Sequence, residues 1–188
     1  MNLAVLAIPG LIGSGKTTTA TLLALRLGWP QDGYGDTIRA IAAARGLPAS
    51  RSILQQLGVE PTGADWGTFT RLVLDHARWA PGQPLILDSL RHLPAATALR
   101  EAIAPLPGII IYLDVPASTA LTRARRRDQA TGPGAVDVRH VTELGVPTVR
   151  DHTDLVIQAR ELKPAQAAGQ VICYLAARLG RAPGGRCA

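Results

Sequence analysis

The chain alternates between short, nearly continuous apolar runs and longer stretches in which apolar residues recur at helical spacing. The apolar runs cover residues 3–8, 84–88, 108–116 and 154–159. Runs without polar alternation predict strands that are buried on both faces, and such strands are typical of a parallel sheet covered by helices. The pattern therefore predicts an α/β protein built on a parallel sheet.

Helical periodicity fills the stretches between these runs. A predicted helix over 16–27 ends at the stop signal of Gly28 and Pro30. The stretch WPQDGYG that follows is rich in turn residues, and Asp36 after it is expected to cap a helix that ends near Gly46. Further helices are predicted over residues 49–60, 65–80, 94–103 and 164–179. The predicted order is βαα(α)βαβαβα, with right-handed crossovers between parallel strands.

Length and composition limit the class of protein. The 188 residues correspond to one ordinary domain, and the chain is 47% apolar, 18% charged and only 4% aromatic. This composition favours a soluble α/β protein with an aliphatic core. The first apolar run is too short to cross a bilayer and no basic residue precedes it, so neither a signal peptide nor a membrane anchor is expected. The expected location is the cytoplasm.

Charge changes this picture by indicating an anionic partner. The formal net charge is +6, and only Lys16 and Lys163 among the 20 basic residues are lysines. Such a charge suits a nucleic acid, an acidic membrane surface or a site that gathers several phosphates. The aromatic residues are scattered along the sequence without a stacking pattern, which argues against nucleic acid. Cys173 and Cys187 are too few for a disulfide scaffold or a zinc site.

One segment carries a specific chemical motif. Residues 10–17, GLIGSGKT, satisfy G-x-x-x-x-G-K-[ST] in full and lie between a predicted strand and a predicted helix, as the motif requires. Glycines let the backbone curl around the β- and γ-phosphates, Lys16 supplies a charge, and the Thr17 hydroxyl is a ligand for Mg²⁺. ATP and Mg²⁺ are therefore the predicted nucleotide and metal. The residues predicted to hold them are Gly10, Gly13, Ser14, Gly15, Lys16, Thr17 and Thr18.

Further segments, taken in order, resemble a known family. They are GDTIRAIAAARG from residue 35, RSILQQLGVE from 51, Trp66, LILDSLRHLP from 85, IIIYLDVPASTALTRARRR from 109, HVTE from 140 and TDLVIQARELK from 153. With the phosphate loop before them, they resemble the P-loop nucleoside monophosphate kinases, most of all the phage-type deoxynucleoside monophosphate kinases and more distantly the adenylate and cytidylate kinases. The likeness covers most of residues 3–163.

The resemblance implies a P-loop NTPase fold of three α/β/α layers with a parallel sheet. It adds a helical acceptor-binding segment over 36–80 and a lid region over 118–150. Together with the composition, it predicts one kinase domain over residues 1–180 and a flexible tail over 181–188. The implied reaction moves the γ-phosphoryl group of Mg·ATP to a (deoxy)nucleoside monophosphate.

A kinase of this kind holds a second phosphate beside the first, and arginine can grip it with two hydrogen bonds while keeping its charge. Arg39, one turn into a predicted helix, and Arg91, just beyond a strand end, are the expected acceptor clamps. A solvated position on the helix is the alternative for Arg39. Asp88 at the strand tip is expected to act in catalysis and to hold Mg²⁺ together with Thr17, unless it is only a cap.

Asp36 is a second candidate for the acidic role and for acceptor binding, with a helix cap as its plain alternative. Gln55, and with less weight Gln56, is expected to read a base edge through its amide or else to face solvent. His140 and Glu143 match an H-x-x-E stretch of the phage-type family, and a structural role is equally open to them.

In the kinases that this chain resembles, a lid helix places arginines over the transferring phosphoryl group, and the resemblance implies this position for the arginine cluster TRARRR. Arg123 and Arg127, four residues apart, share one helix face and are expected to be catalytic, and Arg126 is expected to contact the acceptor. A solvated basic face is the alternative. The run DQATGPGAVDV over residues 128–138 has the composition of a mobile lid.

The chain also departs from the family pattern. Ala95 and Ala96 stand where an acid is usual, and Gln158 stands where an asparagine is expected. Two other functions therefore stay open: a P-loop kinase of another small molecule, such as a nucleoside, a coenzyme precursor or an antibiotic hydroxyl, and a nucleotide-dependent switch or ATPase. The expected partner is a small phosphate acceptor, with no membrane and no nucleic acid, and the expected state is a monomer or homodimer.

Overall fold

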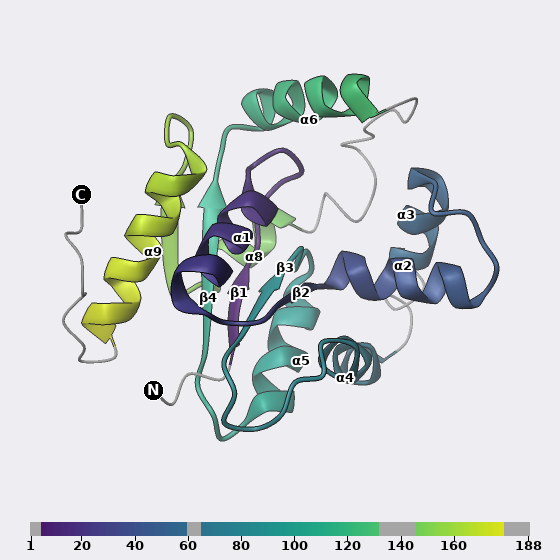
Figure 1. The fold of residues 1–188 in the computed structure, drawn as a ribbon, viewed down its shortest axis with the longest axis horizontal. Coiled ribbons are helices and arrows are strands. Elements are labelled where there is room, and N and C mark those ends of the chain that lie inside the picture. The colour runs from purple at the N-terminus through teal and green to yellow at the C-terminus, as the bar shows by residue number, and fades with distance from the viewer. Residues whose placement is uncertain (1–4, 60–64, 132–145, 179–188) are drawn as a thin grey trace.

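The computed structural model describes residues 5–59, 65–131 and 146–178, and the side chains of residues 51, 59 and 127–131 lie outside this description. Figure 1 shows a sheet with helices on both faces. The sheet has five parallel strands in the order β2-β3-β1-β4-β5. The strands are β1 (Val5–Ile8), β2 (Gln31–Gly33), β3 (Leu85–Asp88), β4 (Gly108–Asp114) and β5 (Leu155–Gln158). The predicted three-layer α/β/α class with a parallel sheet is confirmed.

Strand β2 is absent from the sequence prediction, which treated its residues as part of a turn. It contains only Gln31, Asp32 and Gly33, so it has no apolar run to detect. Its backbone pairs with β3 at the edge of the sheet, where Gly33 lies opposite Asp88. Backbone pairing, rather than burial of apolar side chains, makes this strand.

The described helices follow the predicted order, except that the short helix over Val146–Arg150 was not predicted. They are α1 (Lys16–Leu27), α2 (Tyr34–Ala44), α3 (Arg51–Val59), α4 (Trp66–His76), α5 (Leu93–Ile103), α6 (Ala117–Thr131), α8 (Val146–Arg150) and α9 (Pro164–Arg178). The cap predicted at Asp36 is wrong: the N-cap residue of α2 is Gly33, three residues earlier, so Asp36 lies inside the first turn. At α4 the Asp65 side chain does cap the helix and accepts a hydrogen bond from Gly67 N at 2.9 Å.

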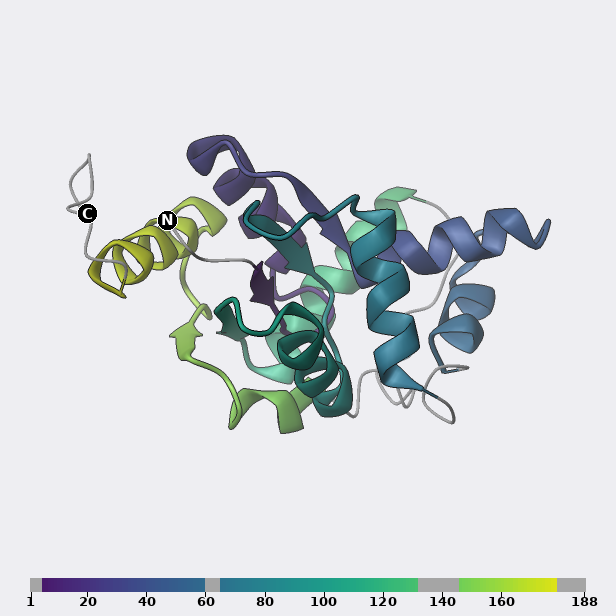
Figure 2. The same cartoon turned by 90° about the horizontal axis from the view of Figure 1, so that it is seen from below.

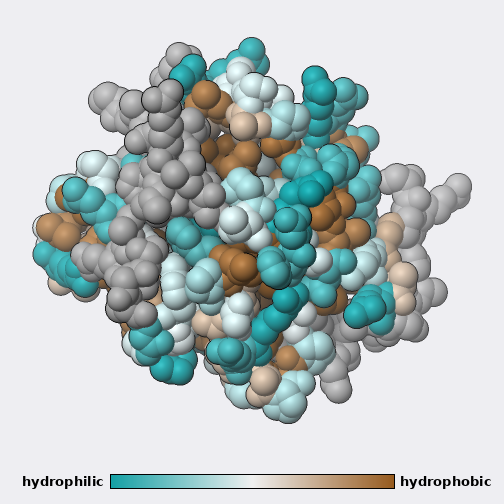
Figure 3. All heavy atoms as spheres, turned by 180° about the vertical axis from the view of Figure 1, so that it is seen from behind, coloured by the Kyte–Doolittle hydropathy of each residue, from teal (hydrophilic) through white to brown (hydrophobic). Residues whose placement is uncertain are grey.

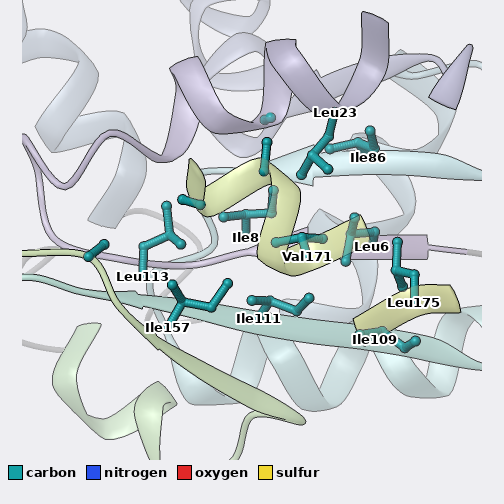
Figure 4. Close-up of a cluster of buried hydrophobic side chains, with 14 of the residues drawn as sticks. Leu6, Ile8, Leu23, Ile86, Ile109, Ile111, Leu113, Ile157, Val171 and Leu175 are labelled. Atoms are coloured by element: carbon teal, nitrogen blue, oxygen red, sulfur yellow. The ribbon is translucent and has the colours of Figure 1, made fainter. Parts of the chain in front are cut away.

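Side chains on alternate strand positions fill two cores, one on each face of the sheet. Leu6 and Ile8 of β1 pack with α1 and α9, where Leu23 and Val171 are fully buried (Figure 4). Val5 and Ala7 point to the other face, against α4, α5 and α8. The continuous apolar runs of the sequence follow from this arrangement, because both faces of each central strand are covered.

Figures 1 and 2 both place α9 on one side of the molecule and α2 with α3 on the opposite side. On the face seen in Figure 3, apolar side chains gather in several separate patches between polar ones. Among the described residues, the large apolar side chains that stand exposed are Leu25, Leu47 and Leu72, which lie on three different segments. Scattered residues of this kind need no partner. No helix in the described part of the chain is long and apolar enough to cross a membrane.

Candidate active site

The phosphate loop joins β1 to α1 in a conformation that depends on glycine. Gly13 and Gly15 have φ angles of 81° and 91°, in the left-handed region that residues with side chains rarely adopt. The Lys16 side chain is buried, with 6% of its surface exposed, and its Nζ donates to Leu11 O at 3.3 Å. The Ser14 hydroxyl is buried without a hydrogen-bond partner among the described residues.

Helix α6 packs directly against this loop. A Cβ added to Gly13 would lie 2.0 Å from Ala120 O and 3.1 Å from Ala124 N, both backbone atoms of α6. A Cβ at Gly10 would lie 2.7 Å from Ser14 Oγ and 3.0 Å from Leu113 O. Glycine at these two positions therefore leaves room for α6 and for the loop itself.

These features fit a bound phosphate chain. The buried Ser14 hydroxyl has unfilled hydrogen-bonding capacity, and the buried Lys16 ammonium group brings a positive charge to the loop. Nearby oxygen donors of the kind that Mg²⁺ prefers are the Thr17 hydroxyl and the Asp88 carboxylate. No cluster of three or more His, Cys, Asp or Glu residues within the described ranges is arranged to hold a metal ion. The donor set thus fits Mg²⁺ held jointly with nucleotide phosphates.

Carboxylates meet at the carboxyl ends of β2 and β3. Asp88 is buried, with 4% of its surface exposed, and lies opposite Gly33, whose absent Cβ would be 2.2 Å from Asp88 Oδ1 and 3.2 Å from Asp36 Oδ2. Burial raises the pKa of Asp36, the charge of Arg39 opposes this, and the neighbouring Asp88 and Asp32 raise it further. Asp36 also pairs with Arg39 on the next turn of α2.

A cavity of about 480 Å³ lies beside the phosphate loop, within the size range of small-molecule sites. Lys16 and Thr17 of the phosphate loop line it, and so do Arg39, Gln55 and Arg91. Three of the predicted acceptor residues are thus brought to the same cavity as the predicted nucleotide residues. They come from α2, α3 and the segment after β3, which are distant in the sequence.

Aromatic rings form one wall of this cavity. Trp66 lies 5.0 Å from His92 and 6.2 Å from Phe69, measured between ring centroids, and Phe69 lies 5.9 Å from Tyr34. All four residues line the cavity. Trp66, Phe69 and Tyr34, which are scattered in the sequence, are therefore gathered in space together with His92. No local pattern reveals this wall, because its members lie on α2, α4 and the start of α5.

Two residues of the aromatic wall, His92 and Tyr34, have shifted pKa values. Burial lowers the pKa of His92 below its ordinary value, and the adjacent positive charge of Arg91 lowers it further. Burial raises the pKa of Tyr34, which the neighbouring Thr70 hydroxyl partly opposes. At neutral pH the wall is therefore uncharged, and the cations of the cavity are Lys16, Arg39 and Arg91.

The remaining predicted residues lie elsewhere or are not described. In α6, Arg123 Nη2 donates to Arg160 O at 2.7 Å and Arg126 is exposed, and neither lines the described cavity. The Arg127 side chain lies outside the described residues, as do His140 and Glu143. The roles of the α6 arginines stay predictions. Thr18 is exposed in the first turn of α1, Gln56 is exposed on α3, and Gln158 donates to Asp114 Oδ2 at 3.1 Å.

Comparisons with known proteins bear on the family and the fold. A protein-family model described as an AAA domain matches residues 6–137. Among solved structures, the chain is similar to a shikimate kinase from Aquifex aeolicus, with a TM-score of 0.57, 15% identity, and 96% of this chain and 99% of that chain covered. It is also similar to a shikimate kinase from Acinetobacter baumannii in complex with shikimate (TM-score 0.59, 19% identity, 94% of both chains).

A third similar structure is a gluconokinase from Sinorhizobium meliloti, with a TM-score of 0.60, 17% identity, and 94% of this chain and 93% of that chain covered. At these identities the likeness establishes a shared P-loop kinase fold and leaves the acceptor open. No curated protein matches the sequence.

Proposed function

The chain belongs to the family described as an AAA domain, and from that premise and its P-loop kinase fold we propose that it transfers the γ-phosphoryl group of ATP to a nucleoside monophosphate. The observation that carries this proposal is the single cavity lined by Lys16 and Thr17 on one side and by Arg39 and Arg91 on the other. Two cationic groups opposite a phosphate loop suit an acceptor that is itself anionic.

Each side chain has a separate task in this transfer. Lys16 binds the transferring phosphate and stabilises the charge that spreads over its oxygens. Arg39 and Arg91 hold the acceptor's phosphate, so that its oxygen is oriented toward the donor. Mg²⁺, when bound, neutralises charge on the ATP phosphates, and Thr17 and Asp88 are the residues that would hold it.

The aromatic wall favours a ring-bearing acceptor. Trp66, Phe69, Tyr34 and His92 offer ring faces and edges against which a nucleobase packs well. Gln55 lines the same cavity and carries an amide that can exchange paired hydrogen bonds with a base edge. The wall also excludes water from the site of transfer.

A second candidate is a kinase of a carboxylate-bearing alcohol. It is favoured by the likeness to a shikimate kinase solved with shikimate and to a gluconokinase. Arg39 and Arg91 can bind a carboxylate as well as a phosphate. Asp88 or Asp36 would then act as the base that accepts the hydroxyl proton.

The test is ADP release by the purified protein with Mg·ATP and one acceptor at a time: ribo- and deoxyribonucleoside monophosphates, nucleosides, shikimate, gluconate, or none. We expect release that depends on one or a few monophosphates. Lys16→Ala should abolish it, whereas Lys163→Ala, at the only other lysine and an exposed position, should not. Stimulation by shikimate or gluconate alone would favour the second candidate, and equal release without acceptor would mean ATP hydrolysis and refute both.

A further inference from the structure

The backbone conformation at Gly35 does not require a glycine. It lies within the first turn of α2, and its φ angle is outside the left-handed region, so any residue could adopt this conformation. Within the described part of the chain, a Cβ at this position would meet no atom closer than 3.6 Å, which is ordinary contact distance. Alanine would also stabilise the helix relative to glycine. The missing side chain therefore points to a space that is kept open for something else.

Hydrogen-bond donors surround this space. The Cβ of a residue at position 35 would lie 3.6 Å from Arg39 Nη1, 3.9 Å from Arg39 Nη2 and 3.9 Å from Ser89 Oγ. Gly35, Arg39 and Ser89 all line the cavity that also contains Lys16. Asp36 pairs with Nη1 of Arg39 and so helps to fix the guanidinium group beside the open space.

Ser89 is held in an unfavourable backbone conformation at this point. Its φ angle is 64°, in the region that favours glycine, and it directly follows Asp88 at the tip of β3. Strained residues of this kind gather at binding and catalytic sites, where the surrounding structure maintains them. The strained residue Ser89 supplies a hydroxyl beside the open space. Gly35, whose backbone is not strained, leaves that space open.

We propose that Gly35, Arg39 and Ser89 form the subsite for the acceptor's phosphate, in which the open space at Gly35 receives a phosphate oxygen and Ser89 Oγ donates a hydrogen bond to it. Ser89 and Gly35 are then specificity-determining residues that no motif identified. This inference rests on the proposed function, because that function supplies the anionic acceptor. A tetrahedral phosphate accepts hydrogen bonds from several directions. Donors that converge from two segments of the chain therefore suit it better than a single donor does.

Gly35→Ala is the most direct test, since it fills the space without a clash. Because a charge-assisted hydrogen bond is lost, we expect the KM for the best monophosphate to rise about 10- to 100-fold, with the KM for ATP unchanged and the melting temperature unchanged or higher. Gly169→Ala makes the same change inside α9, on the opposite side of the molecule, and should leave both KM values unchanged. An unchanged acceptor KM in Gly35→Ala would overturn the proposal.

Two substitutions at position 89 separate the hydroxyl from the strain. Ser89→Ala removes only the hydroxyl, and Ser89→Gly removes the hydroxyl and relieves the strain. Both should raise the acceptor KM, by about 3- to 10-fold for a single hydrogen bond, but only Ser89→Gly should melt at a higher temperature than the parent. Wild-type acceptor KM values in both variants would exclude the hydroxyl from the subsite.

Phosphate binding separates a failure of this subsite from a failure of the proposed function. With a non-hydrolysable ATP analogue saturating the phosphate loop, inorganic phosphate should raise the melting temperature of the wild type and Gly169→Ala, but not of Gly35→Ala. If no monophosphate stimulates ADP release yet this difference appears, the subsite stands and the nucleotide acceptor is wrong. Equal stabilisation of Gly35→Ala by phosphate would refute the subsite whatever the acceptor is.

Discussion

Gly13→Ala tests whether the contact between the phosphate loop and α6 controls the reaction. The added Cβ would lie 2.0 Å from Ala120 O, and ordinary contact begins at 3.4 Å, so α6 or the loop must move by the difference, 1.4 Å. The obstructing atom belongs to the backbone of a helix, so no side-chain rotation can relieve the clash. Alanine at a φ angle of 81° adds about 1–2 kcal/mol of backbone strain.

The expected result is a large loss of rate with a moderate loss of stability. A misplacement on the order of 1 Å near reacting groups can cost about 100-fold in rate, so kcat for the best acceptor should fall by about that factor. Strain of 1–2 kcal/mol should lower the melting temperature by about 2–8 °C in a chain of this size. Steady-state ADP release and a thermal melt of the same preparation measure both effects.

Gly28→Ala is the matched control for this experiment. Gly28 ends α1 with a φ angle of 67°, and an added Cβ there would meet nothing within 4 Å. The control therefore has the same kind of backbone strain without a clash, and it should lose stability but keep kcat within about twofold of the wild type. If Gly13→Ala and Gly28→Ala have the same kcat, the α6 contact has no part in the reaction.

The other predictions concern the aromatic wall and the charges beside it. An acceptor nucleotide should quench tryptophan fluorescence in the wild type and in Trp79→Phe but not in Trp66→Phe, because only Trp66 lines the cavity; persistent quenching in Trp66→Phe would place the base elsewhere. Arg91→Gln should raise the pKa of His92, measured from its imidazole proton resonances in an NMR titration, because it removes the second cause of the depression and leaves burial, the larger one. An unchanged pKa of His92 in Arg91→Gln would contradict the electrostatic effect of Arg91 on this ring. Because the pKa of Asp36 is raised in the folded state, its ionisation opposes folding, so the stability of the wild type relative to Asp36→Asn should fall as pH rises from 3.8 through the folded-state pKa and then level off. Thermal melts of both proteins across this range would show it, and a relative stability of the wild type that rises with pH would contradict the argument.

Much of the fold could be predicted because burial on both faces leaves a clear signal in the sequence. The runs around Leu6, Ile86 and Ile111 became the three inner strands, and the run around Ile157 became the edge strand β5. Strand β2 gave no such signal, since an edge strand of three residues depends on backbone pairing. The start of α2 was misplaced for a related reason: Gly33 at the cap position has no side chain that marks a helix start.

The candidate site was predictable where local chemistry determines it and hidden where folding assembles it. The phosphate loop is a contiguous motif, Arg39 was expected from the family resemblance, and Arg91 was expected from its place after a strand end. The aromatic wall and Ser89 are different, because their roles depend on three-dimensional proximity and on a φ angle that the residue type does not reveal. The predicted catalytic role of Arg123 stays open, since the described structure pairs it with the Arg160 carbonyl.

The most direct measurement of the central claim is a crystal structure with Mg²⁺ and a dinucleotide that joins a donor and an acceptor nucleoside through a phosphate chain. Occupation of one cavity by both ends is the expected result, with Lys16 on the donor phosphates and with Arg39 and Arg91 within hydrogen-bonding distance of the acceptor phosphate. A second nucleoside outside this cavity, with both arginines turned away from every phosphate, would contradict the account.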